Sequence, residues 1–163
     1  MSRMTEWTIH QAQPCDVDAI HRIANENQAA ILSRVHGEAA MRLAYEESTK
    51  DALLRQLGWK HVLVAKVANE VVGTAALANF GRDGVDRWCV SNVYVDMRLH
   101  RKGIGKGLVE AVIGLARARG AAKIEVPSSR NAIAFYSRFG FVVSGPEASD
   151  EVSWLAMELA SDG

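Results

Sequence analysis

The feature that most constrains the fold is a glycine-rich basic turn between an alternating apolar segment and a long amphipathic pattern. Residues 90–120 read VSNVYVDMRLHRKGIGKGLVEAVIGLARARG. Apolar residues alternate up to Val95, which is typical of a strand, and from Ile104 they recur at three- and four-residue spacings, which is typical of a helix. The chain must therefore pass from strand to helix through a glycine-rich turn that carries several basic side chains.

This turn has the composition of an anion site. The basic residues Arg98, His100, Arg101, Lys102 and Lys106 cluster around Gly103, Gly105 and Gly107. Glycines let the backbone approach a ligand closely. The first amides of a helix lack internal partners, and the helix dipole adds positive potential there. The combination predicts a phosphate site, and a solvated basic loop that caps an ordinary helix is the alternative for such a segment taken alone.

Two well-known phosphate loops do not fit the spacing. A P-loop needs Ser or Thr after Gly-Lys, but Lys106 is followed by Gly107. A dinucleotide-binding turn needs Gly-x-Gly-x-x-Gly directly after its strand, whereas here seven residues separate Val95 from Gly103 and the spacing is Gly-x-Gly-x-Gly. Glu125 lies at a suitable distance for the acidic residue of that fold, but the helix-rich N-terminal third fits it poorly.

The remaining patterns predict an α/β fold in which helices pack on a mixed sheet. Strands are expected at 7–11, 61–67, 71–78, 88–95, 123–126, 141–145 and 152–159. Helices are expected to begin near residues 16 and 48 and to cover 103–119 and 131–139. At the second of these, Ser48 and Asp51 have capping-box spacing. The predicted order is β-α-α-β-β-β-α-β-α-β-β.

Two segments together resemble the GNAT superfamily of N-acyltransferases. VYVDMRLHRKGIGKGL resembles the acyl-CoA loop of that family, Gln/Arg-x-x-Gly-x-Gly/Ala after a strand. SSRNAIAFYSRFGF resembles its later segment, Asn-Ala-x-x-Phe-Tyr-x-x-x-Gly-Phe. The two lie at the family's usual separation, and the element order matches along nearly the whole chain. The resemblance implies a GNAT-type, mostly antiparallel central sheet flanked by helices, with residues 1–163 forming a single N-acetyltransferase domain.

The resemblance also implies roles for individual residues. Acetyl-CoA, as co-substrate, would be held at its pyrophosphate by backbone amides of Arg101, Lys102, Gly103, Ile104, Gly105 and Lys106. Backbone groups of Val93, Tyr94 and Val95 would bind the pantetheine arm as an added strand, with Asn131 nearby. Tyr136 would direct its hydroxyl at the thioester sulfur, where an aromatic residue filling a core position is the alternative.

Three positions depart from the family pattern. His100 replaces the usual Gln or Arg, from which we expect weaker or pH-sensitive anchoring. Ser129 stands where many members carry Asn. Cys89 stands where numerous members place a catalytic Glu, and we expect it to be a small buried hydrophobic residue. Glu125 is the replacement candidate for proton transfer, and an edge residue facing water is its alternative.

We therefore expect an N-acetyltransferase that acetylates a primary amine by direct attack in a ternary complex. No Ser or Cys has a recognisable base partner, so no acyl-enzyme is expected. The departure at Cys89 keeps open a non-catalytic acyl-CoA-binding regulatory module, and a nucleotide-phosphate binder is a third hypothesis. Either a small-molecule amine or a protein amino group would be the acceptor. In this superfamily the acceptor regions vary most, and here they contain Glu46, Glu47, Glu147, Asp150 and Glu151. These favour a cationic acceptor, with a solvated acidic surface as the alternative.

Charge and composition narrow the other partners. Nineteen basic residues balance nineteen acidic ones, so binding to nucleic acid or to an anionic membrane is not expected. No apolar run approaches the roughly 18 residues of a membrane helix, and the start lacks the apolar core of a signal peptide, so a cytoplasmic location is expected. Two cysteines and five scattered histidines have no metal-ligand spacing, so no metal is expected. Homodimers are common in the family, but no feature of this sequence decides the oligomeric state.

Overall fold

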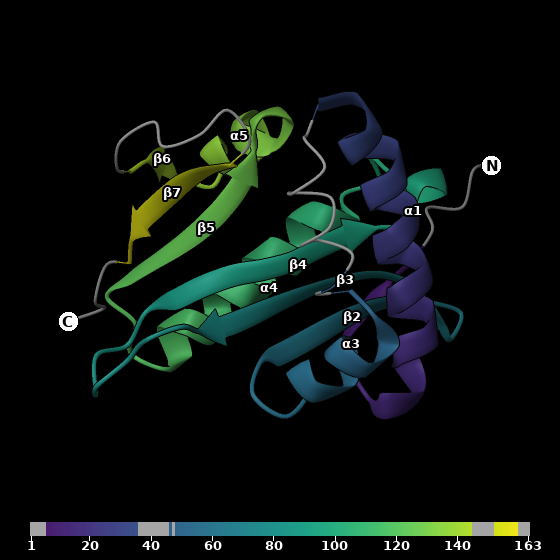
Figure 1. The fold of residues 1–163 in the computed structure, drawn as a ribbon, viewed down its shortest axis with the longest axis horizontal. Coiled ribbons are helices and arrows are strands. Elements are labelled where there is room, and N and C mark those ends of the chain that lie inside the picture. The colour runs from purple at the N-terminus through teal and green to yellow at the C-terminus, as the bar shows by residue number, and fades with distance from the viewer. Residues whose placement is uncertain (1–5, 36–45, 47, 145–151, 160–163) are drawn as a thin grey trace.

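The computed structural model describes residues 6–35, 46, 48–144 and 152–159. A seven-stranded sheet forms its centre, in the spatial order β1-β2-β3-β4-β5-β7-β6 (Figure 1). The strands are β1 Thr8–Gln11, β2 His61–Val67, β3 Glu70–Asn79, β4 Trp88–Val95, β5 Lys123–Ser129, β6 Val142–Val143 and β7 Val152–Glu158. All neighbouring strands pair antiparallel except β4 and β5, which are parallel. The predicted mixed, mostly antiparallel sheet is confirmed.

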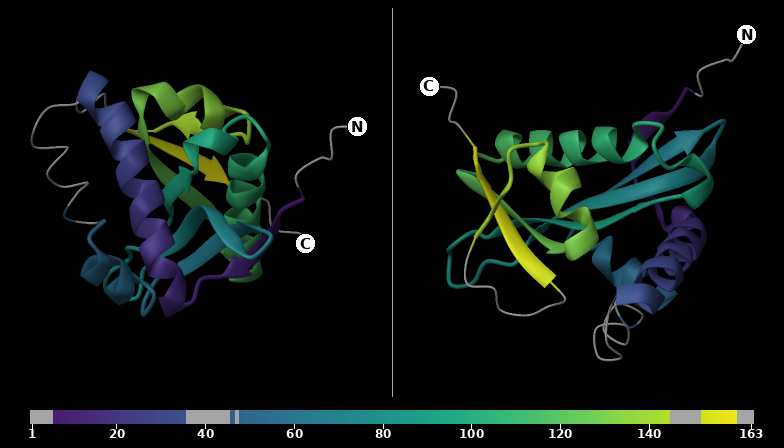
Figure 2. Two further views of the ribbon diagram at one scale, coloured as in Figure 1. Left: turned by 90° about the vertical axis from the view of Figure 1, so that its right-hand side faces the viewer. Right: turned by 90° about the horizontal axis from the view of Figure 1, so that it is seen from above.

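Helices cover both faces of this sheet (Figure 2). They are α1 Val17–Val35, α3 Lys50–Gln56, α4 Ile104–Ala118 and α5 Ile133–Ser137, with short 3-10 turns between some elements. The long helix α4 lies on one face, and α1 lies on the opposite face. The element order along the chain is the predicted one. None of the helices in the described ranges is long and apolar enough to cross a membrane.

The face covered by α4 holds the larger hydrophobic core. Ile104, Leu108 and Val112 form the predicted apolar stripe of α4 and are at most 1% exposed. They pack in one cluster with residues of β3, β4 and β5 and with Tyr136 and Phe141. Burying such side chains contributes roughly 1.5–3 kcal/mol each, so this face fixes the position of α4 on the sheet.

The face covered by α1 and α3 has a smaller apolar cluster and more buried polar side chains. Asn27 and Gln28 of α1, Gln56 of α3, and Lys60 directly before β2 are all buried. Buried polar groups are stable only when they are hydrogen-bonded. The polar side chains of this face therefore link α1 and α3 to particular groups of β4, as described below.

β4 and β5 are in register only where they begin. Their one register pair in the described chain is Cys89 with Glu125, and the two strands then diverge (Figure 1). On its other side β4 pairs with β3, with a bulge between the pairs Thr74–Tyr94 and Ala76–Ser91. The later part of β4 therefore has β3 as its strand neighbour and an edge that β5 does not cover.

One predicted helix start is wrong by a residue. The N-cap of α3 is Thr49, whose hydroxyl accepts a hydrogen bond from the Ala52 amide at 3.2 Å. Ser48 is instead buried and accepts a hydrogen bond from Gln28 Nε2 at 2.8 Å. The capping box of Ser48 and Asp51 does not form, because tertiary contact with α1 uses the Ser48 hydroxyl.

Candidate active site

The basic turn connects β4 to α4 through left-handed backbone. Arg101 has φ of 66° and Gly103, the N-cap of α4, has φ of 85°. A Cβ atom at Gly103 would meet nothing within 4 Å, so the space beside the helix N-terminus is open. The side chains of Arg101, Lys102 and Lys106 are exposed around it. Open backbone amides and exposed positive side chains together provide the features of a phosphate site.

The three glycines of this turn differ in what surrounds them. A Cβ at Gly105 would lie 3.6 Å from both Phe135 Cζ and Val95 Cγ2, so this glycine is where α4, α5 and the end of β4 meet. A Cβ at Gly107 would overlap the ring of Trp7. Gly107 is therefore a packing residue, and the sequence pattern that grouped all three as a ligand loop does not apply to it.

A buried carboxylate holds the start of the turn. Asp96 is 1% exposed and accepts hydrogen bonds from the Arg98 amide at 3.0 Å and from Arg98 Nη2 at 2.7 Å. Arg22 of α1 lies 3.7 Å from the same carboxylate. The hydrogen bond from the Arg98 side chain is the largest cause that lowers the pKa of Asp96 to about 2. Asp96 therefore stays ionised at neutral pH and ties the turn to α1.

The carbonyl of Val95 is bound from two sides. Asn27 Nδ2 donates to it at 2.8 Å, and His100 Nε2 lies 2.9 Å from it. Asn27 Nδ2 also donates to the Ile23 carbonyl at 2.9 Å, which fixes the amide on α1. His100, which departs from the family pattern, thus joins the turn to the last residue of β4. The sequence did not identify Asn27, although an Asn four residues after Ile23 on the apolar face of α1 was a usable signal.

Tyr136 lies in the core beside the divergence of β4 and β5. It is 7% exposed, and its ring packs edge-on against Phe135 and Phe141, with centroids 5.1 and 5.9 Å away. Burial raises the pKa of the Tyr136 phenol, and the nearby Tyr94 raises it further. Its hydroxyl makes no hydrogen bond to a residue of the described ranges. Tyr136 is therefore a neutral phenol whose proton is available for donation.

Asn131 lies two residues after the end of β5, and Val95 is the last residue of β4. Asn131 is exposed in the 3-10 turn Arg130–Ala132 that leads into α5. The carboxyl ends of two parallel strands lie at the same edge of a sheet, and ligands bind there in many α/β proteins. Val93, Tyr94 and Val95 are partly buried at this edge. The structure thus gathers the predicted turn, the end of β4, Asn131 and Tyr136 in one region.

Glu125 lies at the other end of the parallel pair. Its carboxylate is 14% exposed and accepts a hydrogen bond from Arg87 Nε at 2.8 Å. The Arg87 guanidinium in turn lies over the Trp154 ring, 4.5 Å from its centroid. Among the described residues Glu125 pairs with Arg87, and no hydrogen bond joins it to Tyr136.

Cys89 is fully buried, as predicted. In the sheet it is in register with Glu125. Burial is the largest cause that raises the pKa of its thiol to about 11. The thiol is therefore protonated and shielded at neutral pH, which makes it a poor nucleophile. No group of three or more metal-ligating side chains occurs among the described residues.

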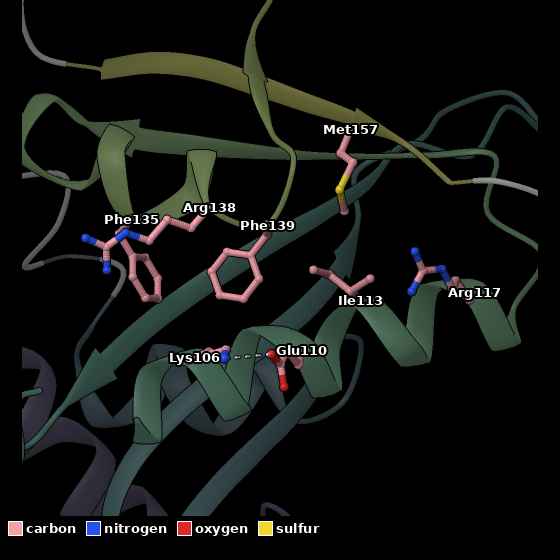
Figure 3. A pocket seen from close by; sticks show the side chains of 8 residues that line it. All are labelled: Lys106, Glu110, Ile113, Arg117, Phe135, Arg138, Phe139 and Met157. Atoms are coloured by element: carbon pink, nitrogen blue, oxygen red, sulfur yellow. Dashed lines mark ion pairs between the residues drawn. The ribbon is translucent and has the colours of Figure 1, made fainter. Parts of the chain in front are cut away.

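A cavity of about 510 Å³ adjoins the turn between α4, α5 and β7 (Figure 3). It is lined by Lys106, Glu110, Ile113, Arg117, Phe135, Arg138, Phe139 and Met157. Only Lys106 among these was predicted as a site residue. The helical spacing from Lys106 to Arg117 indicated one face of α4, but the sequence did not show that Arg138 and Phe139 come opposite.

The predicted acidic acceptor region lies mostly outside the described residues. Glu46 is described and exposed. Glu47, Glu147, Asp150 and Glu151 are outside the described ranges.

Comparisons with known proteins were made for sequence and for structure. The family model described as "Acetyltransferase (GNAT) domain" matches residues 27–161. No curated protein sequence matches the chain.

Many solved structures share the fold. PaiA N-acetyltransferase from Thermoplasma acidophilum in complex with coenzyme A has a TM-score of 0.81 at 16% identity, over 94% of this chain and 99% of that chain. A GCN5-related N-acetyltransferase from Rhodopseudomonas palustris has a TM-score of 0.76 at 20% identity, over 98% and 99%. Ard1 from Thermoplasma volcanium has a TM-score of 0.71 at 22% identity, over 94% and 98%.

Proposed function

The chain belongs to the GNAT acetyltransferase family, and from this membership we propose that it transfers acetyl from acetyl-CoA to a primary amine by direct attack in a ternary complex. The observation that carries the proposal is the meeting of three elements at Gly105. There a Cβ atom would be in van der Waals contact with both Val95 and Phe135, so the open N-terminus of α4 lies beside the uncovered end of β4 and the aromatic face of α5. An extended ligand with phosphates at one end can use all three at once.

The residues present fit coenzyme A. Its pyrophosphate would be held by the amides from Arg101 to Lys106, where the backbone at Gly103 is unobstructed. The adjoining cavity offers the cations of Arg117 and Arg138, which suit a further phosphate. The coenzyme A in the PaiA structure is consistent with this assignment by fold.

The pantetheine arm would lie along the edge of β4 that β5 leaves uncovered. Main-chain groups at a strand edge bind extended ligands in the manner of an added strand. We propose that Val93 and Tyr94 provide most of these groups, with Asn131 on the opposite side. The Val95 carbonyl contributes less than the sequence predicted, because Asn27 and His100 already bind it.

Tyr136 would donate a hydrogen bond to the departing sulfur. A thiol resembling cysteine has a pKa of about 8.5 and a free phenol about 10, so complete proton transfer is uphill by roughly 2 kcal/mol. Burial raises the pKa of Tyr136 and makes that transfer more unfavourable. We therefore assign Tyr136 as a hydrogen-bond donor to the developing thiolate, which receives its proton finally from solvent.

The attacking amine must lose a proton. An amine resembling lysine has a pKa near 10.4, so roughly one molecule in two thousand is neutral at pH 7. Glu125 is proposed to accept this proton through water rather than directly, because its carboxylate is bound by Arg87. An acyl-enzyme on Cys89 is not proposed, since that thiol is buried with a raised pKa.

The rival function is a non-catalytic acyl-CoA-binding module. It is favoured by the Cys89 that stands in place of a catalytic Glu and by the ion pair that occupies Glu125. Thioester consumption measured across cationic, neutral and anionic primary amines separates the two functions. We expect acetylation of a cationic small amine or of a protein amino group near basic residues. Tight acetyl-CoA binding without turnover of any amine would favour the rival.

A further inference from the structure

We propose that Lys60 is a positioning residue for acetyl transfer, which acts through Ser91 and Asn92 to fix the bulge of β4 beside the acetyl group. The inference rests on the proposed function, because it assumes that acetyl-CoA lies along the uncovered end of β4. It concerns the face of the sheet opposite α4, at the bulge of β4 rather than at the turn.

A continuous hydrogen-bonded chain runs from the end of α3 to the bulge. Lys60 Nζ donates to Ser91 Oγ at 3.0 Å, and Ser91 Oγ donates to Asn92 Oδ1 at 2.9 Å. Asn92 Nδ2 then donates to Gln56 Oε1 at 2.5 Å. Lys60 and Gln56 are buried, at 9% and 7% exposure, and Ser91 and Asn92 are partly buried, so water competes little at the two ends of this hydrogen-bonded chain.

The chemistry of these side chains fixes the direction in which hydrogen bonds are donated from Lys60 to Gln56. A lysine ammonium can only donate, so the Ser91 hydroxyl accepts from Lys60 and directs its own proton at Asn92. Asn92 Oδ1 accepts this hydrogen bond, which leaves the amide nitrogen of Asn92 directed toward Gln56. Both ends of the Asn92 side chain are therefore held, and the positive end of the chain lies at Lys60.

Asn92 is the residue where β4 changes its register with β3. Its φ is 54°, a left-handed conformation that Asn tolerates better than most residues. Between the pairs Ala76–Ser91 and Thr74–Tyr94, β4 has two residues where β3 has one. Such a bulge re-aims the backbone groups of the strand. Fixing the Asn92 side chain on both sides therefore fixes the direction of those groups.

The bulge also lies where the thioester must be. The phosphate turn follows Val95, so an extended pantetheine arm runs back along β4 from Val95 toward Asn92. Its thioester end would arrive where β4 and β5 separate after the pair Cys89–Glu125. Backbone donors aimed at the acetyl carbonyl there stabilise the negative charge that forms on its oxygen.

Two aromatic rings hold the Lys60 ammonium in place. Nζ lies 5.0 Å from the centroid of the Trp59 ring and 5.8 Å from that of Phe80. The two rings themselves pack edge-on, with centroids 5.6 Å apart. These ring contacts add to the hydrogen bond with Ser91 and favour the observed orientation of the ammonium, which a positioning role requires.

Lys60→Met tests the proposal because methionine keeps an unbranched apolar side chain beside Trp59 and Phe80 and removes the donor to Ser91. The probe is acetyl-CoA carrying ¹³C at the acetyl carbonyl, and isotope-edited infrared spectroscopy measures the carbonyl stretch. We expect the wild-type protein to lower this frequency on binding and Lys60→Met to lower it less at unchanged affinity. With an amine acceptor, kcat should fall about 10- to 100-fold while KM for acetyl-CoA stays within about twofold.

Lys50→Met is the matched control, since Lys50 is exposed at the start of α3 and pairs with Asp18. It should leave both the carbonyl frequency and kcat unchanged. A folded Lys60→Met protein with the wild-type frequency and kcat overturns the proposal. If Lys60→Met does not fold, Ser91→Ala breaks the same chain and is read by the same two measurements, with the same outcomes.

The test separates this inference from the proposed function. Wild-type protein that shifts the carbonyl frequency but acetylates no amine contradicts the proposed activity, and the comparison with Lys60→Met still decides the positioning role. Wild-type protein that does not bind acetyl-CoA contradicts both.

Discussion

The two ends of β4 are held by different kinds of interaction. At its start, Cys89 is in register with Ala78 of β3 on one side and Glu125 of β5 on the other. This closed end is completed by the ion pair of Glu125 with Arg87 and by the Trp154 ring beneath the guanidinium.

At its other end β4 is open on the side of β5. Val95 is in register with Gly73 of β3, and the side chains of Asn27 and His100 bind its carbonyl. Asp96, the next residue, is held by Arg98. Side chains from α1 and the turn thus stabilise the open end where a neighbouring strand stabilises the closed end.

The difference shows how a sheet can keep a strand edge available without losing the strand. Main-chain pairing uses the groups that an extended ligand needs, whereas side-chain contacts at a strand end leave most of them accessible. Changes at the open end should therefore affect ligand binding and turnover. Changes at the closed end should mainly affect stability, except at Glu125, for which a part in proton transfer is proposed.

The largest expected effect is from Gly103→Glu or Gly105→Glu. Each adds a negative side chain where phosphate must approach, and at Gly103 the left-handed backbone adds strain. Calorimetry should detect no acetyl-CoA binding. Gly114→Glu places the same side chain at an exposed position of the same helix with nothing within 4 Å, and it should bind normally. Normal affinity of both turn variants would show that the turn is not the phosphate site.

Tyr136→Phe should have the next largest effect. It removes the hydroxyl and leaves the ring packing against Phe135 and Phe141 intact. Acid–base assistance is typically worth about 10²–10⁴ in rate, so kcat should fall by about that factor. Affinity for acetyl-CoA should stay within a few-fold, and Tm should not fall. Turnover at the wild-type rate would identify Tyr136 as a packing residue.

Glu125→Gln tests whether the closed end takes part in proton transfer at all. We expect kcat/KM to fall about tenfold, most at low pH, where neutral amine is scarcest. The effect should be smaller than that of Tyr136→Phe, because Arg87 binds the carboxylate. Arg87→Gln breaks the same ion pair but keeps the carboxylate. If both variants lose the same activity and the same stability, Glu125 has only a structural role.

The same contrast explains what the sequence could predict. The stripe of Ile104, Leu108 and Val112 follows from periodicity, because burial of one helix face dictates it. The turn at Gly103 follows from composition, since few other residues adopt its conformation. The fold and the left-handed backbone of the turn could therefore be predicted from the sequence.

Contacts that join distant segments could not be predicted from the sequence. The bond from Asn27 to Val95 spans 68 residues, and nothing local to either residue indicates it. The pairing of Arg87 with Glu125 depends on the register of two strands that lie 38 residues apart at this point. The packing of Trp7 against Gly107, which leaves no room for a Cβ atom there, also joins distant segments, which is why the sequence grouped Gly107 with the glycines of the expected ligand loop.

Asp96→Asn should lower stability in a pH-dependent way. The pKa of Asp96 is lowered from 3.8 to about 2 in the folded protein, so its ionised form is favoured by folding. That stabilisation is complete above about pH 5 and is lost as pH falls through 3.8 toward 2. Because Arg98 is exposed to solvent, we expect about 1 kcal/mol at neutral pH, rather than the full value of the shift.

Urea unfolding at neutral pH and near pH 3 measures this effect. The difference between wild type and Asp96→Asn should shrink at the lower pH. Asp18→Asn, which breaks an exposed ion pair with Lys50, should change stability little at either pH. An equal loss from Asp96→Asn at both pH values would show that the ionised carboxylate is not what stabilises the turn.

The smallest expected effect is at His100, where the chain departs from its family. The imidazole Nε2 can donate to the Val95 carbonyl in the protonated form and in one neutral tautomer, and a Gln amide can donate there too. His100→Gln should therefore bind acetyl-CoA within about twofold of wild type at neutral pH. Asn27 still donates to the same carbonyl, so even His100→Ala should lose only a few-fold in affinity. Calorimetry of the three proteins at neutral pH measures these differences. A loss of affinity in His100→Ala as large as that of the glycine variants would show that the hydrogen bond from Asn27 is not enough to hold the Val95 carbonyl.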